Sequence, residues 1–182
     1  MALKATICKA ELQITDLDRD YYQAHSLTIA QHPSETDERM MLRILAFTLN
    51  ASEALSYTRG ISTDDEPDIW EKNLSGEIEL WIDLGQPDDK RVRKACGRAH
   101  EVIIYTYKER SAGIWWNQVQ DKLARFHNLS VIHLQAAEPD TLEQMSRRNM
   151  QLQCTIQDGT VWLSDETHNI EVQTMAWKSP VR

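Results

Sequence analysis

Hydrophobic and polar residues alternate along the first thirty residues of the chain, which predicts a pair of long strands. Residues 3–15 alternate over their whole length, and a second extended stretch covers residues 21–31. The polar run Asp16-Leu17-Asp18-Arg19-Asp20 lies between them and is typical of a turn, so we expect an antiparallel hairpin. A helix is expected next, with Ser34 as its N-cap and its end near Leu55.

Two further strands are predicted near residues 68–73 and 76–84. Alternation in the second one places acidic residues on one face, where Glu77, Glu79, Trp81 and Asp83 occupy every second position. Carboxylates that share a face repel each other unless a positive charge lies among them, and a divalent cation such as Mg²⁺ is the simplest candidate. The alternative is a solvated sheet face, which we favour for Glu77 and Glu79.

The second half of the chain alternates helices with strands. Helical and extended patterns are predicted for residues 87–96 (helix), 101–107 (strand), 113–126 (helix), 129–134 (strand) and 139–150 (helix), and for three extended runs at 151–157, 160–163 and 169–176. Asp158-Gly159 is expected to form a hairpin turn. This order predicts an α/β fold with a mixed central β-sheet flanked by helices.

Composition limits the class of protein. At 182 residues, with 41% hydrophobic and 26% charged residues, the chain fits one soluble globular domain covering residues 1–182,. A net charge of −8 argues against a surface that coats nucleic acid broadly, but it leaves room for a local basic groove,. The dispersed Cys8, Cys96 and Cys154 predict reduced thiols in a cytoplasmic protein, and no apolar run approaches the ~18 residues of a membrane helix.

The predicted element order resembles the core of the PD-(D/E)xK nuclease superfamily, with an added N-terminal hairpin and C-terminal strands. The resemblance implies that Asp68, after Pro67, and Asp83 hold Mg²⁺, with Glu38 from the first helix as an auxiliary ligand. The lysine expected two residues after the second acid is replaced by Gly85. Gln86 and Lys90 are the candidates to take over its role, and Lys94 is a further one.

Basic residues are concentrated in the helix predicted after Pro87. Arg91, Lys94 and Arg98 lie at i, i+3 and i+7, so they share a helix face that suits phosphate contacts. The alternative is a solvated face whose charge is balanced by Asp88 and Asp89.

Four stretches of the sequence are specific enough to indicate a family: the opening residues 1–7, His32-Pro33-Ser34-Glu35-Thr36, Glu66-Pro67-Asp68-Ile69-Trp70, and Ile82-Asp83-Leu84-Gly85-Gln86-Pro87 through Arg91 to Ala99. In these stretches, and over nearly its full length, the sequence resembles the YaeQ family of small bacterial proteins. The resemblance implies a cytoplasmic protein with a variant of the nuclease fold. A fold does not by itself imply an activity.

These observations lead to three functional hypotheses. The preferred one is a Mg²⁺-dependent nuclease that hydrolyses DNA or RNA with Asp68, Asp83, Glu38 and either Gln86 or Lys90. The second is a catalytically inactive module of the same fold that binds nucleic acid or a protein of the transcription or repair machinery. The third is a protein-interaction scaffold that binds no nucleic acid.

Overall fold

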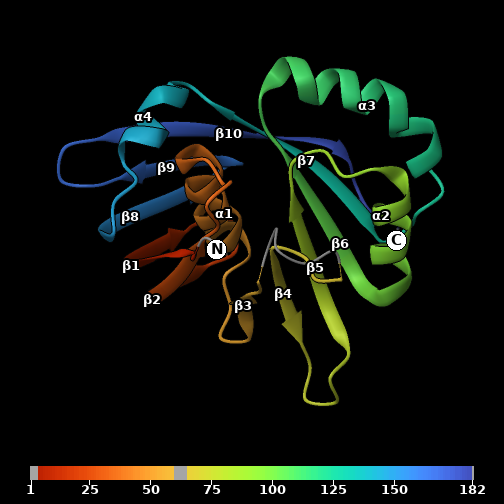
Figure 1. Cartoon of the computed structure of the whole chain (residues 1–182), viewed down its shortest axis with the longest axis horizontal. Coiled ribbons are helices and arrows are strands. Elements are labelled where there is room, and N and C mark those ends of the chain that lie inside the picture. The colour runs from red at the N-terminus through yellow and green to blue at the C-terminus, as the bar shows by residue number, and fades with distance from the viewer. Residues whose placement is uncertain (1–3, 60–64, 182) are drawn as a thin grey trace. The chain divides into compact units, whose positions relative to one another are not determined.

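The computed structural model describes residues 4–59 and 65–181, which form a mixed α/β fold (Figure 1). The chain divides into two compact units, Met1–Ala51 with Ala136–Thr174, and Ser52–Gln135 with Met175–Arg182. We call them unit 1 and unit 2 and describe each by itself. Within the described ranges, no helix combines the length and the apolar character needed to cross a membrane.

Unit 1 contains the hairpin predicted at the start of the chain. Its elements are β1 (Thr6–Asp16), β2 (Tyr21–Gln31), α1 (Asp37–Asn50), α4 (Pro139–Gln144), β8 (Asn149–Gln157), β9 (Thr160–Ser164) and the part of β10 (Asn169–Lys178) up to Thr174. The strand order is β2-β1-β8-β9-β10, in which β1 and β8 are parallel and the other three pairs are antiparallel. Asp158 and Gly159 form the predicted turn and have φ angles of 53° and 75°.

The core of unit 1 lies on one face of its strands. Alternate residues of β1 and β8 are buried, while the residues between them are mostly exposed, as expected for strands with a single covered face,. Helix α1 covers this face, because Arg43 donates to the carbonyl of Ala30 on β2 and Phe47 packs edge-to-face against His25.

Unit 2 contains the predicted alternation of strands and helices. Its elements are β3 (Leu55–Tyr57), β4 (Ile69–Lys72), β5 (Ile78–Leu84), α2 (Asp89–Arg98), β6 (Ala99–Thr106), α3 (Glu109–Leu123), β7 (Leu129–Ala136) up to Gln135, and the end of β10 from Met175. The strand order is β7-β6-β5-β4-β3, in which β5, β6 and β7 are parallel and the other two pairs are antiparallel. The predicted mixed sheet is therefore confirmed, and apolar residues of α2, α3 and the parallel strands form its core.

Several element boundaries differ from the predictions, among them the ends of α1 and α4 and the start of α3, which begins at Glu109 rather than Gly113. Thr36 rather than Ser34 caps α1, because its hydroxyl accepts from the backbone N–H of Arg39, whereas the Ser34 hydroxyl contacts the His32 ring. Helix α1 ends at Asn50, and the hydroxyl of Ser52 then accepts from the N–H of Leu55 as the chain turns into the unpredicted strand β3. Helix α4 ends at Gln144, because β8 begins already at Asn149.

Candidate functional site

The two carboxylates predicted to bind metal lie on neighbouring strands of unit 2. Asp68 precedes β4, and its N–H donates to the carbonyl of Ile82 on β5 at 3.1 Å. The Asp68 side chain accepts from the backbone N–H of Leu84 at 2.9 Å, next to Asp83. Both acids are buried, with 4% of Asp68 and 3% of Asp83 exposed. Strand pairing thus brings together the two acids that the sequence predicted.

The charge of Asp83 is balanced by an arginine from the following helix. Arg91 on α2 donates from Nε to Asp83 Oδ2 at 2.9 Å and from Nη2 to Asp83 Oδ1 at 3.1 Å. The same Nη2 donates to the carbonyl of Glu66 at 2.9 Å. The indole N–H of Trp81 donates to Asp83 Oδ2 at 3.0 Å. Both oxygens of this carboxylate therefore accept hydrogen bonds, and the arginine binds it in the bidentate geometry of strong charge-assisted pairs.

The surroundings of Asp83 shift its pKa in both directions. Desolvation raises the pKa of the Asp83 carboxyl above its ordinary value, and the nearby negative charge of Asp68 adds to this rise. The guanidinium of Arg91 and the indole of Trp81 lower the same pKa. Asp68 and Asp83 are thus close enough to interact, and Arg91 is the group that favours an ionised Asp83.

Neither Gln86 nor Lys90, the first candidates for the missing lysine, is among the residues that donate to Asp83. Gly85 has a φ of 105°, in a region where side chains are strained, and its N–H donates to the carbonyl of Tyr105. Gln86 is exposed and its amide donates to the hydroxyl of Ser111 at 3.2 Å. Lys90 is exposed on the first turn of α2. The cation that contacts Asp83 is Arg91, which sequence reasoning had placed among the phosphate-binding residues.

Glu38 belongs to unit 1, so the geometry around Asp68 and Asp83 is described without it. It is half-buried in the first turn of α1. The fully buried acid of this segment is Glu35, which pairs with Arg39 at 2.6 Å and with Arg43 at 2.7 Å. Sequence reasoning missed Glu35, although an arginine eight residues further on was visible in the sequence.

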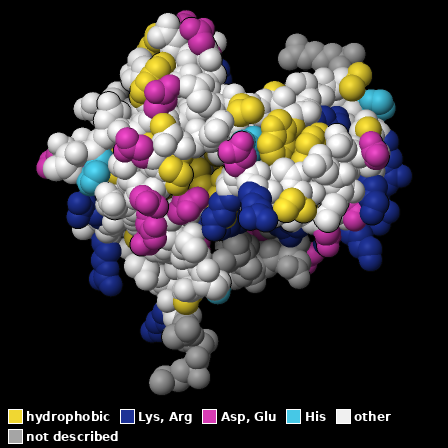
Figure 2. Space-filling view, turned by 90° about the horizontal axis from the view of Figure 1, so that it is seen from above, with side chains coloured by type: hydrophobic (Ala, Val, Ile, Leu, Met, Phe, Trp, Pro, Cys, Tyr) yellow, Lys and Arg dark blue, Asp and Glu magenta, His cyan; other side chains and the backbone are white. Residues whose placement is uncertain are grey.

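The outer face of α2 carries a group of basic side chains. Lys94 contacts the carboxylate of Asp65 at 2.5 Å, and Arg98 donates to the backbone carbonyl of Asp65 at 2.8 Å. Lys90 and Arg93 are also exposed, and neither forms an ion pair with any residue that the structure describes. We call Lys90, Arg93, Lys94 and Arg98 the α2 basic face. On the surface shown in Figure 2, basic and acidic side chains are interspersed.

The environment of Asp83 does not fit the Mg²⁺ ion that the superfamily resemblance implies. Mg²⁺ requires oxygen ligands in near-octahedral geometry and usually retains several waters. Here both Asp83 oxygens accept from Arg91 or Trp81, and Asp68 Oδ2 accepts from a backbone N–H. A metal at this carboxylate would compete with the guanidinium for the same oxygens. Asp83 forms a buried ion pair with Arg91, so its charge is balanced without a metal.

Comparison with known proteins places the chain in a family. The family model described as "YaeQ protein" matches residues 1–174. The chain belongs to the YaeQ family. YaeQ proteins of Salmonella typhi and of Escherichia coli strain K12 are each 51% identical over 180 residues, which is 99% of this chain and 99% of theirs. Both bear the name "Uncharacterized protein YaeQ", so membership brings no activity with it.

Solved structures of YaeQ proteins have the same fold. The crystal structure of YaeQ from Xanthomonas axonopodis pv. citri has a TM-score of 0.93 and 45% identity, over 97% of this chain and 99% of that one. The crystal structure of YaeQ from Pseudomonas syringae has a TM-score of 0.89 and 34% identity, over 96% and 97%. The YaeQ prediction made from the sequence is confirmed.

Proposed function

We propose that the chain is a metal-independent module that binds nucleic acid through the α2 basic face. In this proposal the fold is a variant of the PD-(D/E)xK core in which an arginine has replaced the metal. The observation that carries it is the arrangement of cations on one helix: α2 turns Arg91 inward to Asp83 and leaves four other cations exposed.

The contact between Arg91 and Asp83 argues against hydrolysis. A nuclease of this type needs a cation that polarises the phosphoryl group and activates water. The carboxylate that would hold it is engaged by Arg91, and Gly85 offers no amine. The acids therefore stabilise the fold and fix the position of α2, which is the binding element.

The α2 basic face supplies the phosphate contacts. Lys90 and Arg93 are one turn apart and share a face with Lys94 and Arg98,. The ion pair between Lys94 and Asp65 is exposed, with 48% and 79% of the two side chains accessible, so it adds little stability and a phosphate can compete for the lysine,. Binding by up to four cations predicts that log K falls with log salt with a slope of roughly −2 to −3 on single strands.

The test is fluorescence anisotropy of a labelled single-stranded oligonucleotide of mixed sequence, titrated in EDTA at several salt concentrations. We expect binding that persists in EDTA and weakens with the slope given above. The double substitution Lys90→Glu with Arg93→Glu should weaken binding at least tenfold and flatten the slope. The matched control, Lys122→Glu with Arg125→Glu, makes the same charge change at the end of α3 and should bind like the parent chain.

Two results would overturn the proposal in different directions. Cleavage of the oligonucleotide in Mg²⁺ or Mn²⁺ that is lost in Asp83→Asn would establish the nuclease hypothesis instead. Failure to retain single-stranded, double-stranded or branched nucleic acid even at low salt would leave the protein-interaction scaffold.

A further inference from the structure

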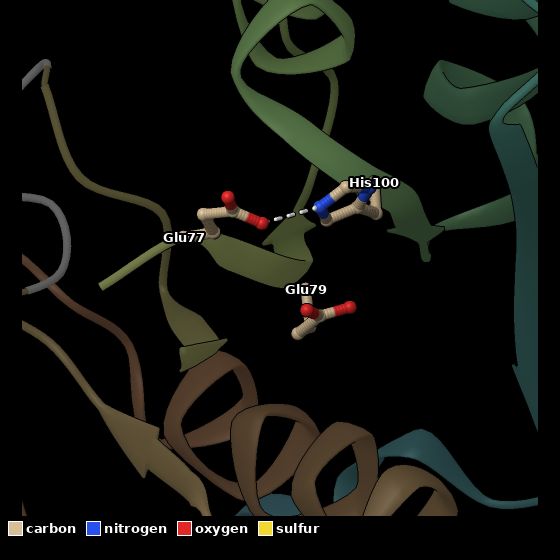
Figure 3. Close-up of side chains that lie close together, drawn as sticks. All are labelled: Glu77, Glu79 and His100. Carbon is tan, nitrogen blue, oxygen red and sulfur yellow. Dashed lines mark hydrogen bonds and ion pairs between the residues drawn. The ribbon is translucent and has the colours of Figure 1, made fainter. Parts of the chain in front are cut away.

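A second group of ionisable side chains lies at the opposite end of β5 from Asp83. Glu77 immediately precedes this strand, Glu79 is its second residue, and His100 is the second residue of the parallel neighbour β6. The register pairs Ile78 with Ala99 and Leu80 with Glu101, so Glu79 and His100 are at the same level of the sheet. One ligand atom from each of the three side chains lies within 4.8 Å of the other two. Figure 3 shows the three side chains and the contact between Glu77 and His100.

The β4–β5 turn holds the two carboxylates in place. Asn73 Oδ1 accepts from the backbone N–H groups of Ser75 and Glu77, each at 2.9 Å. Its Nδ2 donates to Glu79 Oε1 at 2.9 Å and to Glu77 Oε2 at 3.2 Å. The Asn73 amide therefore bridges both acids, as the outer-shell partners of metal ligands commonly do.

The charge of these carboxylates is balanced differently from that of Asp83, which pairs with an arginine. The Glu77 carboxylate accepts from the Asn73 amide and contacts the His100 ring. Among the residues described, no lysine or arginine forms an ion pair with Glu77 or Glu79; the partner of Glu77 is His100, at 3.2 Å. Two carboxylates are thus held side by side without a permanent cation.

We propose that Glu77, Glu79 and His100 bind one divalent transition-metal ion of the zinc type. Ligands at about 2.1 Å from a tetrahedral Zn²⁺ are about 3.4 Å apart. Glu77 and His100 already meet this spacing at 3.2 Å, and the remaining contraction from 4.8 Å is within the reach of flexible glutamate side chains. An imidazole together with carboxylates favours Zn²⁺ or a similar ion over Mg²⁺, which prefers oxygen ligands alone.

The site is open to solvent. His100 and Glu77 are 59% and 61% exposed, so the ion can enter freely and water can complete its coordination. This metal site is separate from the proposed nucleic-acid contact, which needs no metal. The proposed ligands include Glu77 and Glu79, for which the sequence favoured a solvated sheet face, together with His100 from the next strand.

The test is isothermal titration of the full chain with Zn²⁺ in a non-chelating buffer. We expect one saturable site per chain, and a loss of affinity of at least tenfold in each of Glu79→Gln and His100→Asn. The matched controls Glu101→Gln and His127→Asn change exposed residues of the same types in the same unit and should leave the affinity unchanged. Urea unfolding without metal should be the same for all variants, because these side chains are at the surface.

Two outcomes would overturn the assignment. One is a chain that takes up no Zn²⁺ under these conditions. The other is affinity that survives in Glu79→Gln and His100→Asn but is lost in His168→Asn, which would move the ion to His168 and Asp165 in unit 1.

Discussion

Replacing Arg91 with methionine removes the guanidinium from Asp83 and keeps most of the aliphatic stem. We expect a marked loss of stability, because a carboxylate with 3% exposure is then left in the interior without its cation. The substitution deletes two hydrogen bonds to Asp83, at 2.9 and 3.1 Å, and one to the Glu66 carbonyl, at 2.9 Å. Breaking a buried ion pair by removing one partner typically costs about 3–5 kcal/mol.

The magnitude at this site lies at the lower end of that range. The Arg91 side chain is 27% exposed, so water screens part of the interaction, and we expect a loss of about 3 kcal/mol at pH 7,. For a chain of this size such a loss corresponds to a fall in Tm of roughly 6–12 °C.

The loss should depend on pH in one direction. Burial raises the pKa of Asp83, and removing Arg91 removes the main influence that lowers it. A carboxyl whose folded pKa is raised binds more protons when folded than when unfolded, so its cost is absent below the unfolded pKa, grows as the pH rises from there and is complete above the folded pKa. The difference between Arg91→Met and the parent chain should therefore shrink when the pH is lowered from 7 toward the ordinary pKa of an aspartate.

The measurement is urea unfolding followed by tryptophan fluorescence at several pH values. All tryptophans except Trp162 lie in unit 2, so the emission reports mainly on the unit that contains Asp83. Arg93→Met is the matched control, because Arg93 is an exposed neighbour on the same helix and should change stability by less than about 0.5 kcal/mol,. Equal stability of Arg91→Met and Arg93→Met at pH 7 would refute the reasoning.

Three further predictions follow from other parts of the structure. Glu35→Ala leaves Arg43 buried without its carboxylate and should destabilise unit 1 by about 3 kcal/mol, measured by circular dichroism during urea unfolding; an unchanged midpoint would contradict the buried pair,. Gly85→Lys restores the residue type of the nuclease motif but forces a side chain onto a φ of 105°, so it should lower the free energy of unfolding by roughly 1–3 kcal/mol,. Gly97→Ala in α2 should instead raise it by about 0.5–1 kcal/mol,. A Gly85→Lys chain more stable than the Gly97→Ala chain would show that the Gly85 backbone is not strained. Burial raises the pKa of the Cys154 thiol to about 12, so Ellman's reagent should modify it only after denaturation, and rapid labelling of the native chain would contradict its burial,.

Much of the fold could be predicted from the sequence, because local patterns determine it. The alternation in residues 3–15 and 21–31 led to the β1–β2 hairpin, and the strand and helix order after Asp83 led to the parallel strands. The boundaries were less accurate where tertiary contacts decide them. Strand β3 has three residues and depends on pairing with β4, which no local pattern reveals.

The candidate site was predicted in part. Asp68 and Asp83 come together because their strands are neighbours, which followed from the order of elements. The partner of Asp83 did not follow, because helical spacing groups Arg91 with Lys94 and Arg98, and only the packing of α2 against the sheet shows that Arg91 turns inward. His100 was missed for a related reason. It lies beside Glu77 and Glu79 only because β5 and β6 pair, and more than twenty positions separate it from them in the sequence.

Arg91, rather than a metal ion, balances the charge of Asp83 in this structure. The most direct test is anomalous diffraction from a crystal of the chain soaked in Mn²⁺. We expect no anomalous peak at Asp83, with the guanidinium of Arg91 still within hydrogen-bonding distance of both carboxylate oxygens. A Mn²⁺ ion bound to Asp68 and Asp83 with Arg91 displaced would contradict the claim and return the site to the chemistry of a nuclease.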